Sequence, residues 1–248
     1  MERVEFTNSR GLRLAGEWRP SDGACGLVLA HGFTSDKSSR GRFHRLAEAL
    51  NAARYHTLAF DFAGCGESSD DLLTLPGQQD DLLCATRFLR SLGVQQVAWY
   101  GHSLGSLIAL RAWTPEIPTM VLTGAATGPI RYDWPSYFSP AQLHEWRTTG
   151  RLTVNQPEGL RRRVVVDGAL LDAFEHIDQP ALLGNVHCPV LIVHGDTGDE
   201  ERRLLANSRA ALPLLPAGSR LEVIPGAAHG FDGCCQRVID VTLAWLEE

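Results

Sequence analysis

The chain has 248 residues, of which 44% are hydrophobic and 21% are charged, and its formal net charge at pH 7 is −6. These values predict a globular protein of one domain, because α/β enzymes of about this size are routinely single domains. The negative charge argues against a nucleic-acid or anionic-membrane partner, since either would require a concentrated positive surface.

Three further features bear on location and metal binding. Residues 1–5 lack the charged start and apolar core of a signal peptide. We find no uncharged apolar run of about 18 residues that could span a membrane. The six cysteines show neither the C-x-x-C spacing nor the ligand spacing of a zinc finger. We therefore expect a cytoplasmic protein with reduced thiols and no bound metal.

The predicted elements begin with a hairpin, whose alternating strands at 4–6 and 12–15 are joined by a polar turn. Short apolar runs without alternation follow at 26–30, 57–60, 97–100, 120–122, 190–193 and 221–224. Strands of this kind are covered on both faces, so the runs predict a mostly parallel central sheet. Amphipathic stretches around 43–50, 82–92 and 238–245 predict helices that flank it. The fold class is therefore α/β.

Residues 128–187 do not follow this pattern of apolar runs separated by amphipathic stretches. The segment contains no clear strand, it accumulates aromatic residues and prolines, and it is too long for a bare loop in a compact domain. We interpret it as an inserted helical cap, with helices at 140–147 and 168–174. The expected division is a core of residues 1–127 and 188–248 and a cap of residues 128–187, within a single domain overall.

The sequence Gly101-His102-Ser103-Leu104-Gly105 follows the apolar run 97–100 and precedes a helix-compatible run at 106–113. A serine between a strand and a helix lies on a tight, strained turn that exposes its hydroxyl, and glycines two residues away on each side relieve the crowding. This context predicts that Ser103 is a nucleophile.

An acyl-transfer nucleophile needs donors for the developing oxyanion. One donor is expected at the start of the helix after Ser103, and a second from a loop at the same sheet edge. His31-Gly32-Phe33-Thr34 follows the first buried strand. We therefore predict an oxyanion hole made by the backbone N–H groups of Phe33 and Leu104, and we expect His31 to hold its loop by a structural hydrogen bond.

The base must be a histidine that can face Ser103. His229 follows the strand at 221–224 in a glycine-containing loop, at the edge where catalytic groups of open α/β sheets gather. An acid must orient the imidazole, and it should follow the strand at 190–193. Four acidic residues compete there (Asp196, Asp199, Glu200 and Glu201), although acidic residues also favour the first turn of a helix.

Together these motifs resemble the α/β-hydrolase superfamily over nearly the whole chain, and within it the small esterases of the cinnamoyl/feruloyl-esterase type and the serine-aminopeptidase-like hydrolases. The resemblance rests on the loop after residue 30, the serine turn, the strand and loop from Pro189 to Gly195, His229, and the stretch Asp61-Phe62-Ala63-Gly64-Cys65-Gly66-Glu67-Ser68. It implies the α/β-hydrolase fold and a structural role for the Asp61 stretch.

The chain departs from this family at one position. Relatives usually carry His-Gly-x-x-Asp after the strand, and Gly198 stands where that aspartate would be. Asp199 follows one residue later, so we predict Asp199 as the triad acid, with Asp196 as the alternative.

The resemblance implies a serine hydrolase that cleaves a carboxylic ester through a Ser103–His229–Asp199 acyl-enzyme mechanism without a cofactor. The expected partner is a small-molecule ester with a small or aromatic acyl group. A serine peptidase or amidase, a thioesterase and a catalytically inactive binding protein on the same fold are the alternatives. The sequence does not predict the oligomeric state.

Overall fold

The computed structural model describes residues 1–156 and 159–248, and its centre is an eight-stranded sheet. The strands are β1 (Glu2–Thr7), β2 (Arg13–Arg19), β3 (Cys25–Ala30), β4 (His56–Phe60), β6 (Gln96–His102), β7 (Met120–Thr123), β10 (Val190–Gly195) and β11 (Arg220–Ile224). Their order is β1-β2-β4-β3-β6-β7-β10-β11. Strand β2 pairs antiparallel with β1 and β4, and the other neighbours pair parallel. The predicted hairpin and mostly parallel sheet are confirmed.

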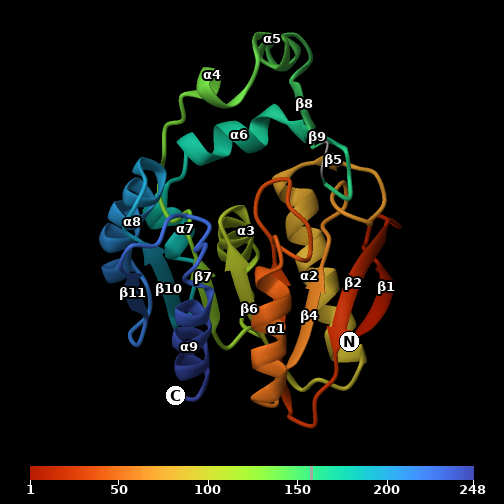
Figure 1. Cartoon of the computed structure of the whole chain (residues 1–248), viewed down its shortest axis with the longest axis vertical. Coiled ribbons are helices and arrows are strands. Elements are labelled where there is room, and N and C mark those ends of the chain that lie inside the picture. Colours follow the sequence, from red (N-terminus) through yellow and green to blue (C-terminus); the bar gives the residue numbers. More distant parts are fainter. Residues whose placement is uncertain (157–158) are drawn as a thin grey trace.

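Helices cover both faces of this sheet (Figure 1). They are α1 (Arg42–Ala52), α2 (Leu75–Ser91), α3 (Leu104–Ala112), α8 (Asp199–Ala211), which runs into a short 3-10 turn (Leu212–Leu214), and α9 (Cys235–Leu246). Alternate strand residues belong to two separate cores. In β6, Val97 and Trp99 pack in the core that includes α2, α3 and α8, whereas Ala98 and Tyr100 pack in the core of α1 and α9. Among the described residues, no helix combines the length and apolarity needed to cross a bilayer.

The segment expected to be a helical cap contains α4 (Trp134–Tyr137), α5 (Pro140–Thr149), α6 (Gly168–Glu175) and α7 (Gln179–Leu183). It also contains β8 (Arg151–Asn155) and β9 (Arg163–Asp167), so the expectation that it lacks strands is wrong. These strands pair antiparallel, and β9 also pairs with β5 (Leu72–Leu73). In Figure 1 the hairpin formed by β8 and β9 lies together with helices α4–α6 above the end of the main sheet. Residues 157 and 158 of the expected cap lie outside the described residues.

The hairpin forms because one face of it is buried. Leu152, Val164 and Val166 are buried, while the intervening residues are partly or fully exposed. This alternation matches the period of two of a half-buried strand. The aromatic residues of this segment pack on one another and against the main core: the Trp134 ring centroid lies 4.7 Å from that of Tyr132 and 5.9 Å from that of Trp146. The aromatic residues therefore account for much of the packing of this segment.

Close packing of α3 against β3 fixes the start of the helix. A Cβ atom placed on Gly105 would overlap the backbone carbonyl of Ala30. We predict that Gly105→Ala lowers the free energy of unfolding by at least about 3 kcal/mol, because the helix must move away from the strand.

Gly93→Ala is the matched control, because Gly93 has a φ of +93° and no atom within 4 Å of the added methyl group. It should cost only about 1–2 kcal/mol, the cost of placing a side chain on left-handed backbone. Urea unfolding measures both values, and equal losses would contradict the packing argument.

Candidate active site

Ser103 occupies the turn between β6 and α3 with φ +54° and ψ −120°. This backbone conformation is rare for a residue with a side chain and stores about 1–3 kcal/mol of strain. A Cβ atom on Gly101 would lie 2.7 Å from the carbonyl oxygen of Gly105, which explains why the turn requires glycine. The Ser103 N–H is held by the carbonyl of Thr123 at 2.9 Å. The predicted strained turn is thus present.

His229 reaches Ser103 from the loop after β11. Its Nε2 atom lies 3.0 Å from Ser103 Oγ, and its side chain is 26% exposed. A Cβ atom on Gly124, the residue after β7, would come within 2.9 Å of the imidazole, so glycine at this position leaves space for the ring. The structure therefore brings together the two residues that the sequence predicted as nucleophile and base.

The acid beside His229 is Glu201, not Asp199. Glu201 Oε2 lies 2.6 Å from His229 Nδ1, and its side chain is 1% exposed. Asp199 is the first residue of α8, and its side chain is 86% exposed, with Arg202 as a neighbour at 3.8 Å. The prediction of Asp199 is wrong because α8 begins at this residue, and the helix turns Asp199 to solvent and Glu201 toward the sheet.

Asp196 has a different contact. Its Oδ1 atom accepts a hydrogen bond from the N–H of Gly226 at 2.7 Å, and the N–H of Asp196 donates to the carbonyl of Ala227 at 3.0 Å. These bonds hold the loop that carries His229 against the loop after β10. Asp196 therefore shapes the site without contacting the imidazole.

Helical spacing is the signal that could have identified Glu201. Glu201 stands three, four and seven residues before Leu204, Leu205 and Ser208, and all four side chains are buried. Residues at this spacing share one face of a helix. A carboxylate on the buried face of an amphipathic helix is rare unless it is paired, and this marks Glu201 as the exceptional acid of the loop.

The surroundings of Glu201 keep it ionised. Burial alone would raise its pKa, but hydrogen bonds from His194 and His229 outweigh burial and lower the pKa to about 2. Because a carboxylate only accepts hydrogen bonds, the Nδ1 atom of His229 carries the proton that lies between them. The Nε2 atom of His229 is then free to accept the hydroxyl proton of Ser103.

His31 and His102 are further buried histidines near the site. Burial lowers the pKa of His31, whose Nδ1 donates to the carbonyl of Gly32 at 2.9 Å and whose Nε2 accepts from the N–H of Phe62 at 3.3 Å. This is the expected loop-holding role. Burial, together with the charge of Arg42, lowers the pKa of His102 well below its usual value.

The loop after β3 brings the proposed oxyanion donors to Ser103. A Cβ atom on Gly32 would lie 3.3 Å from the Cβ atom of Ser103, so the backbone that leads into Phe33 passes close to the nucleophile. Leu104 is the first residue of α3, directly after Ser103. Within the described parts of the chain, the N–H groups of Phe33 and Leu104 donate no backbone or side-chain hydrogen bond. Both groups are therefore available to a ligand.

A buried ion pair anchors the far end of this loop. Lys37 Nζ lies 2.8 Å from Asp61 Oδ2, and the Lys37 N–H donates to Asp61 Oδ1 at 2.6 Å. The same carboxylate accepts the N–H of Glu67 at 2.9 Å. Both charged side chains are at least 95% buried. The Asp61 stretch thus has the structural role that the resemblance implied.

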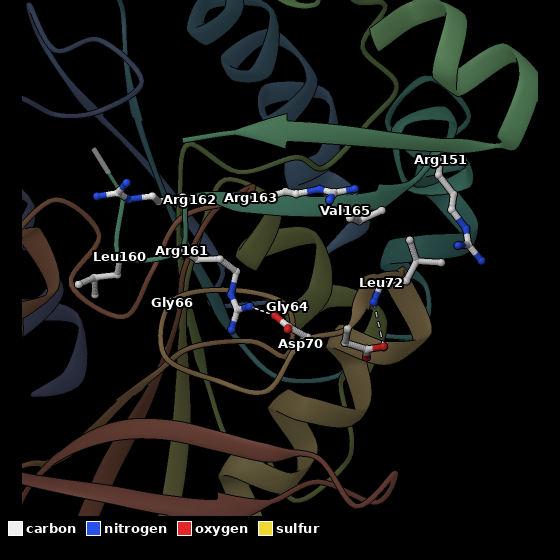
Figure 2. A pocket seen from close by; sticks show the side chains of 11 residues that line it. Gly64, Gly66, Asp70, Leu72, Arg151, Leu160, Arg161, Arg162, Arg163 and Val165 are labelled. Atoms are coloured by element: carbon white, nitrogen blue, oxygen red, sulfur yellow. Dashed lines mark hydrogen bonds and ion pairs between the residues drawn. The ribbon is translucent and has the colours of Figure 1, made fainter. Parts of the chain in front are cut away.

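One cavity on this protein lies away from Ser103, Glu201 and His229. It measures about 810 Å³, and its lining includes Asp70, Arg161, Arg162 and Arg163 but not Ser103, Glu201 or His229. Figure 2 shows the Arg161 guanidinium turned toward Asp70, with which it pairs, while Arg162 and Arg163 extend in opposite directions. The cationic groups do not converge on one point, so this cavity does not resemble a built anion site.

A second cavity adjoins the loop after β3. It measures about 650 Å³, and Phe33, Asp36, Arg40 and Gln156 contribute to its lining. The side chain of Gln156, the residue directly after β8, donates to the carbonyl of Thr34. The hairpin in residues 128–187 thus contacts the loop that carries a proposed oxyanion donor.

Comparison with known proteins agrees with this fold. The model of a family described as the alpha/beta hydrolase family matches residues 27–240. The structure is similar to Est1E from Butyrivibrio proteoclasticus with bound ferulic acid, at 19% identity, over 99% of this chain and 100% of that chain, with a TM-score of 0.71. It is also similar to a thermophilic esterase from Thermogutta terrifontis, at 22% identity, over 100% of this chain and 98% of that chain, with a TM-score of 0.71. A third similar structure is an esterase from Exiguobacterium antarcticum, at 17% identity, over 100% of both chains, with a TM-score of 0.69. No curated protein matches the sequence.

The lowered pKa of Glu201 predicts how stability depends on pH. A carboxylate whose pKa is lower in the folded state stabilises that state above its unfolded pKa, near 4.5, and the contribution is lost as the pH falls toward 2. Between these limits the free energy of unfolding of the wild type should fall by up to about 3 kcal/mol more than that of Glu201→Gln. Urea unfolding of both proteins across this range measures the difference. A constant gap between them would contradict the prediction.

Proposed function

The chain belongs to the alpha/beta hydrolase family, and on that premise we propose that it is a serine hydrolase that cleaves carboxylic esters. The observation that carries the proposal is the continuous hydrogen-bonded series from Ser103 through His229 to Glu201, with lengths of 3.0 and 2.6 Å. A nucleophile, a base and an orienting acid in this order are the requirements of acyl transfer through a covalent intermediate.

In the proposed acylation step, Ser103 Oγ attacks the ester carbonyl carbon while His229 Nε2 takes the hydroxyl proton. The carbonyl oxygen becomes an oxyanion, which the N–H groups of Phe33 and Leu104 stabilise by hydrogen bonds. His229 then gives its proton to the leaving alcohol as the carbon–oxygen bond breaks. The ionised Glu201 stabilises the imidazolium that exists between these two proton transfers.

In the proposed deacylation step, water replaces the alcohol. His229 Nε2 takes a proton from this water, whose oxygen attacks the acyl carbon of the acyl-enzyme. The same backbone donors stabilise the second oxyanion. Collapse of this intermediate returns the proton to Ser103 and releases the carboxylic acid, so the reaction needs no cofactor or metal.

The substrate class is proposed from the neighbourhood of the oxyanion donors. The cavity beside Phe33 has room for a small acyl or alcohol group, and residues 128–187 contribute Gln156 to its wall. We propose that this segment acts as a cap over the site and that the substrate is an ester with a small or aromatic acyl group. Est1E, whose structure holds ferulic acid, shares this fold, which supports the proposed aromatic acyl group.

We predict that the purified protein hydrolyses p-nitrophenyl esters and that Ser103→Ala lowers kcat at least about 10⁴-fold, because the nucleophile is lost. A series of rising acyl length, a hydroxycinnamate ester, an aminoacyl amide and a thioester would define the bond that is preferred. Faster turnover of the amide or the thioester would replace the carboxylesterase assignment by a peptidase or a thioesterase. Activity that survives in Ser103→Ala would contradict the mechanism.

We also predict unequal effects of two acidic residues on the same helix. Glu201→Gln should lower kcat at least about 100-fold, because the imidazole loses the charge that orients it and stabilises its cation. Asp199→Asn should leave kcat within about 2-fold, since an exposed charge in high dielectric contributes little. The measurement is kcat of each variant with one ester. A larger loss of kcat in Asp199→Asn than in Glu201→Gln would identify Asp199 as the acid.

A further inference from the structure

We propose that His194 is a positioning residue for the acid of this site: it holds the Glu201 carboxylate in the orientation that His229 requires. The inference rests on the proposed function and assigns a role to a residue outside the series Ser103–His229–Glu201. His194 lies near the end of β10, and its side chain is 0% exposed. A fully buried imidazole needs partners for both ring nitrogens.

Both partners of His194 come from α8. The Nδ1 atom lies 2.7 Å from Glu201 Oε1, and the Nε2 atom lies 2.8 Å from Ser208 Oγ. Glu201 and Ser208 are seven residues apart, which is about two helical turns, so they face β10 from the same side of α8. The ring of His194 fills the space between them and fixes α8 to the strand at two points.

The two oxygens of Glu201 have separate tasks. Oε1 accepts from His194 Nδ1 and, at 2.9 Å, from the N–H of Gly195, whereas Oε2 faces His229. With Oε1 held by two donors, the carboxyl plane cannot rotate without breaking hydrogen bonds in a buried site. The orientation of Oε2 toward His229 therefore depends on the donor that His194 supplies.

The far nitrogen of His194 continues the network. With the ring proton on Nδ1, which bonds the carboxylate, the Nε2 atom can accept a hydrogen bond from the Ser208 hydroxyl. Ser208 Oγ lies 3.0 Å from Thr127 Oγ1, so Thr127 can donate to Ser208 in turn. Each polar group in this buried series has a partner, as buried networks require.

The position of the acid explains the need for such support. Glu201 reaches His229 from the first turn of α8, and its side chain has one more rotatable bond than an aspartate side chain. A longer side chain loses more conformational freedom when it is ordered, so it gains more from a second fixed contact.

Two substitutions of one residue test the proposal. The amide nitrogen of asparagine can take the place of the Nδ1 atom, so His194→Asn keeps the donor to Glu201. The longer side chain of His194→Gln carries its amide to the region of Nε2 and Ser208, so the donor to Glu201 is lost. The readout is the second-order rate at which a fluorophosphonate labels Ser103, which needs no knowledge of the substrate.

We expect His194→Gln to label at least about 10-fold more slowly than wild type and His194→Asn to remain within about 3-fold, since small misplacement of catalytic groups costs up to about 100-fold in rate. With a p-nitrophenyl ester the loss should appear in kcat and leave KM unchanged. Equal labelling rates for the two variants, at equal folded fractions by circular dichroism, would overturn the proposal.

Ser208→Ala provides a smaller change in case His194→Gln does not fold. It should also slow labelling, because the ring loses its fixed contact at Nε2. Thr242→Val is the matched control, since Thr242 is a buried hydroxyl that donates to Val238 at 2.8 Å within α9, on the other face of the sheet. Labelling rates that are equal in Ser208→Ala and Thr242→Val would overturn the proposal. Wild-type enzyme that is not labelled at Ser103 would overturn the proposed function itself.

Discussion

The hydrogen bond between Glu201 and His229 is the contact on which the geometry of the site depends. It joins an imidazole from the loop after β11 to a carboxylate from α8, and it leaves the other ring nitrogen facing Ser103. Removal of either partner would leave a buried charge or an unoriented ring, both of which are costly in a site with little solvent. The arrangement also settles the tautomer of His229, because the carboxylate can only accept.

The sheet makes this contact possible by bringing separate strand ends to one edge. Ser103 follows β6, the loop with Phe33 follows β3, Glu201 follows β10 and His229 follows β11. Close backbone approaches at glycines let these segments meet: Gly32 lies against Ser103, and Gly124 lies against His229. The placement of these side chains therefore depends on the central sheet, as expected for open α/β folds.

Sequence patterns predicted the parts of the molecule that are determined by residues close together in the chain. The buried strands, the turn at Ser103 and the loop position of His229 all follow from apolar runs, glycine spacing and chain order. Chain order predicts only the loop that carries the acid, and the resemblance to the His-Gly-x-x-Asp pattern favours Asp199 within it, whereas the start of α8 decides which carboxylate points inward. The strands β8 and β9 were missed because each has only five residues, and β9 gains a second partner in Leu72–Leu73, far earlier in the chain, which local patterns do not reveal.

A crystal structure of the enzyme after reaction with a fluorophosphonate would test the central claim most directly. The account predicts phosphorus bonded to Ser103 Oγ, one phosphoryl oxygen accepting from the N–H groups of Phe33 and Leu104, and Glu201 still bonded to His229 Nδ1. A phosphoryl group on another residue, or an adduct in which Asp199 has replaced Glu201 beside the imidazole, would contradict it.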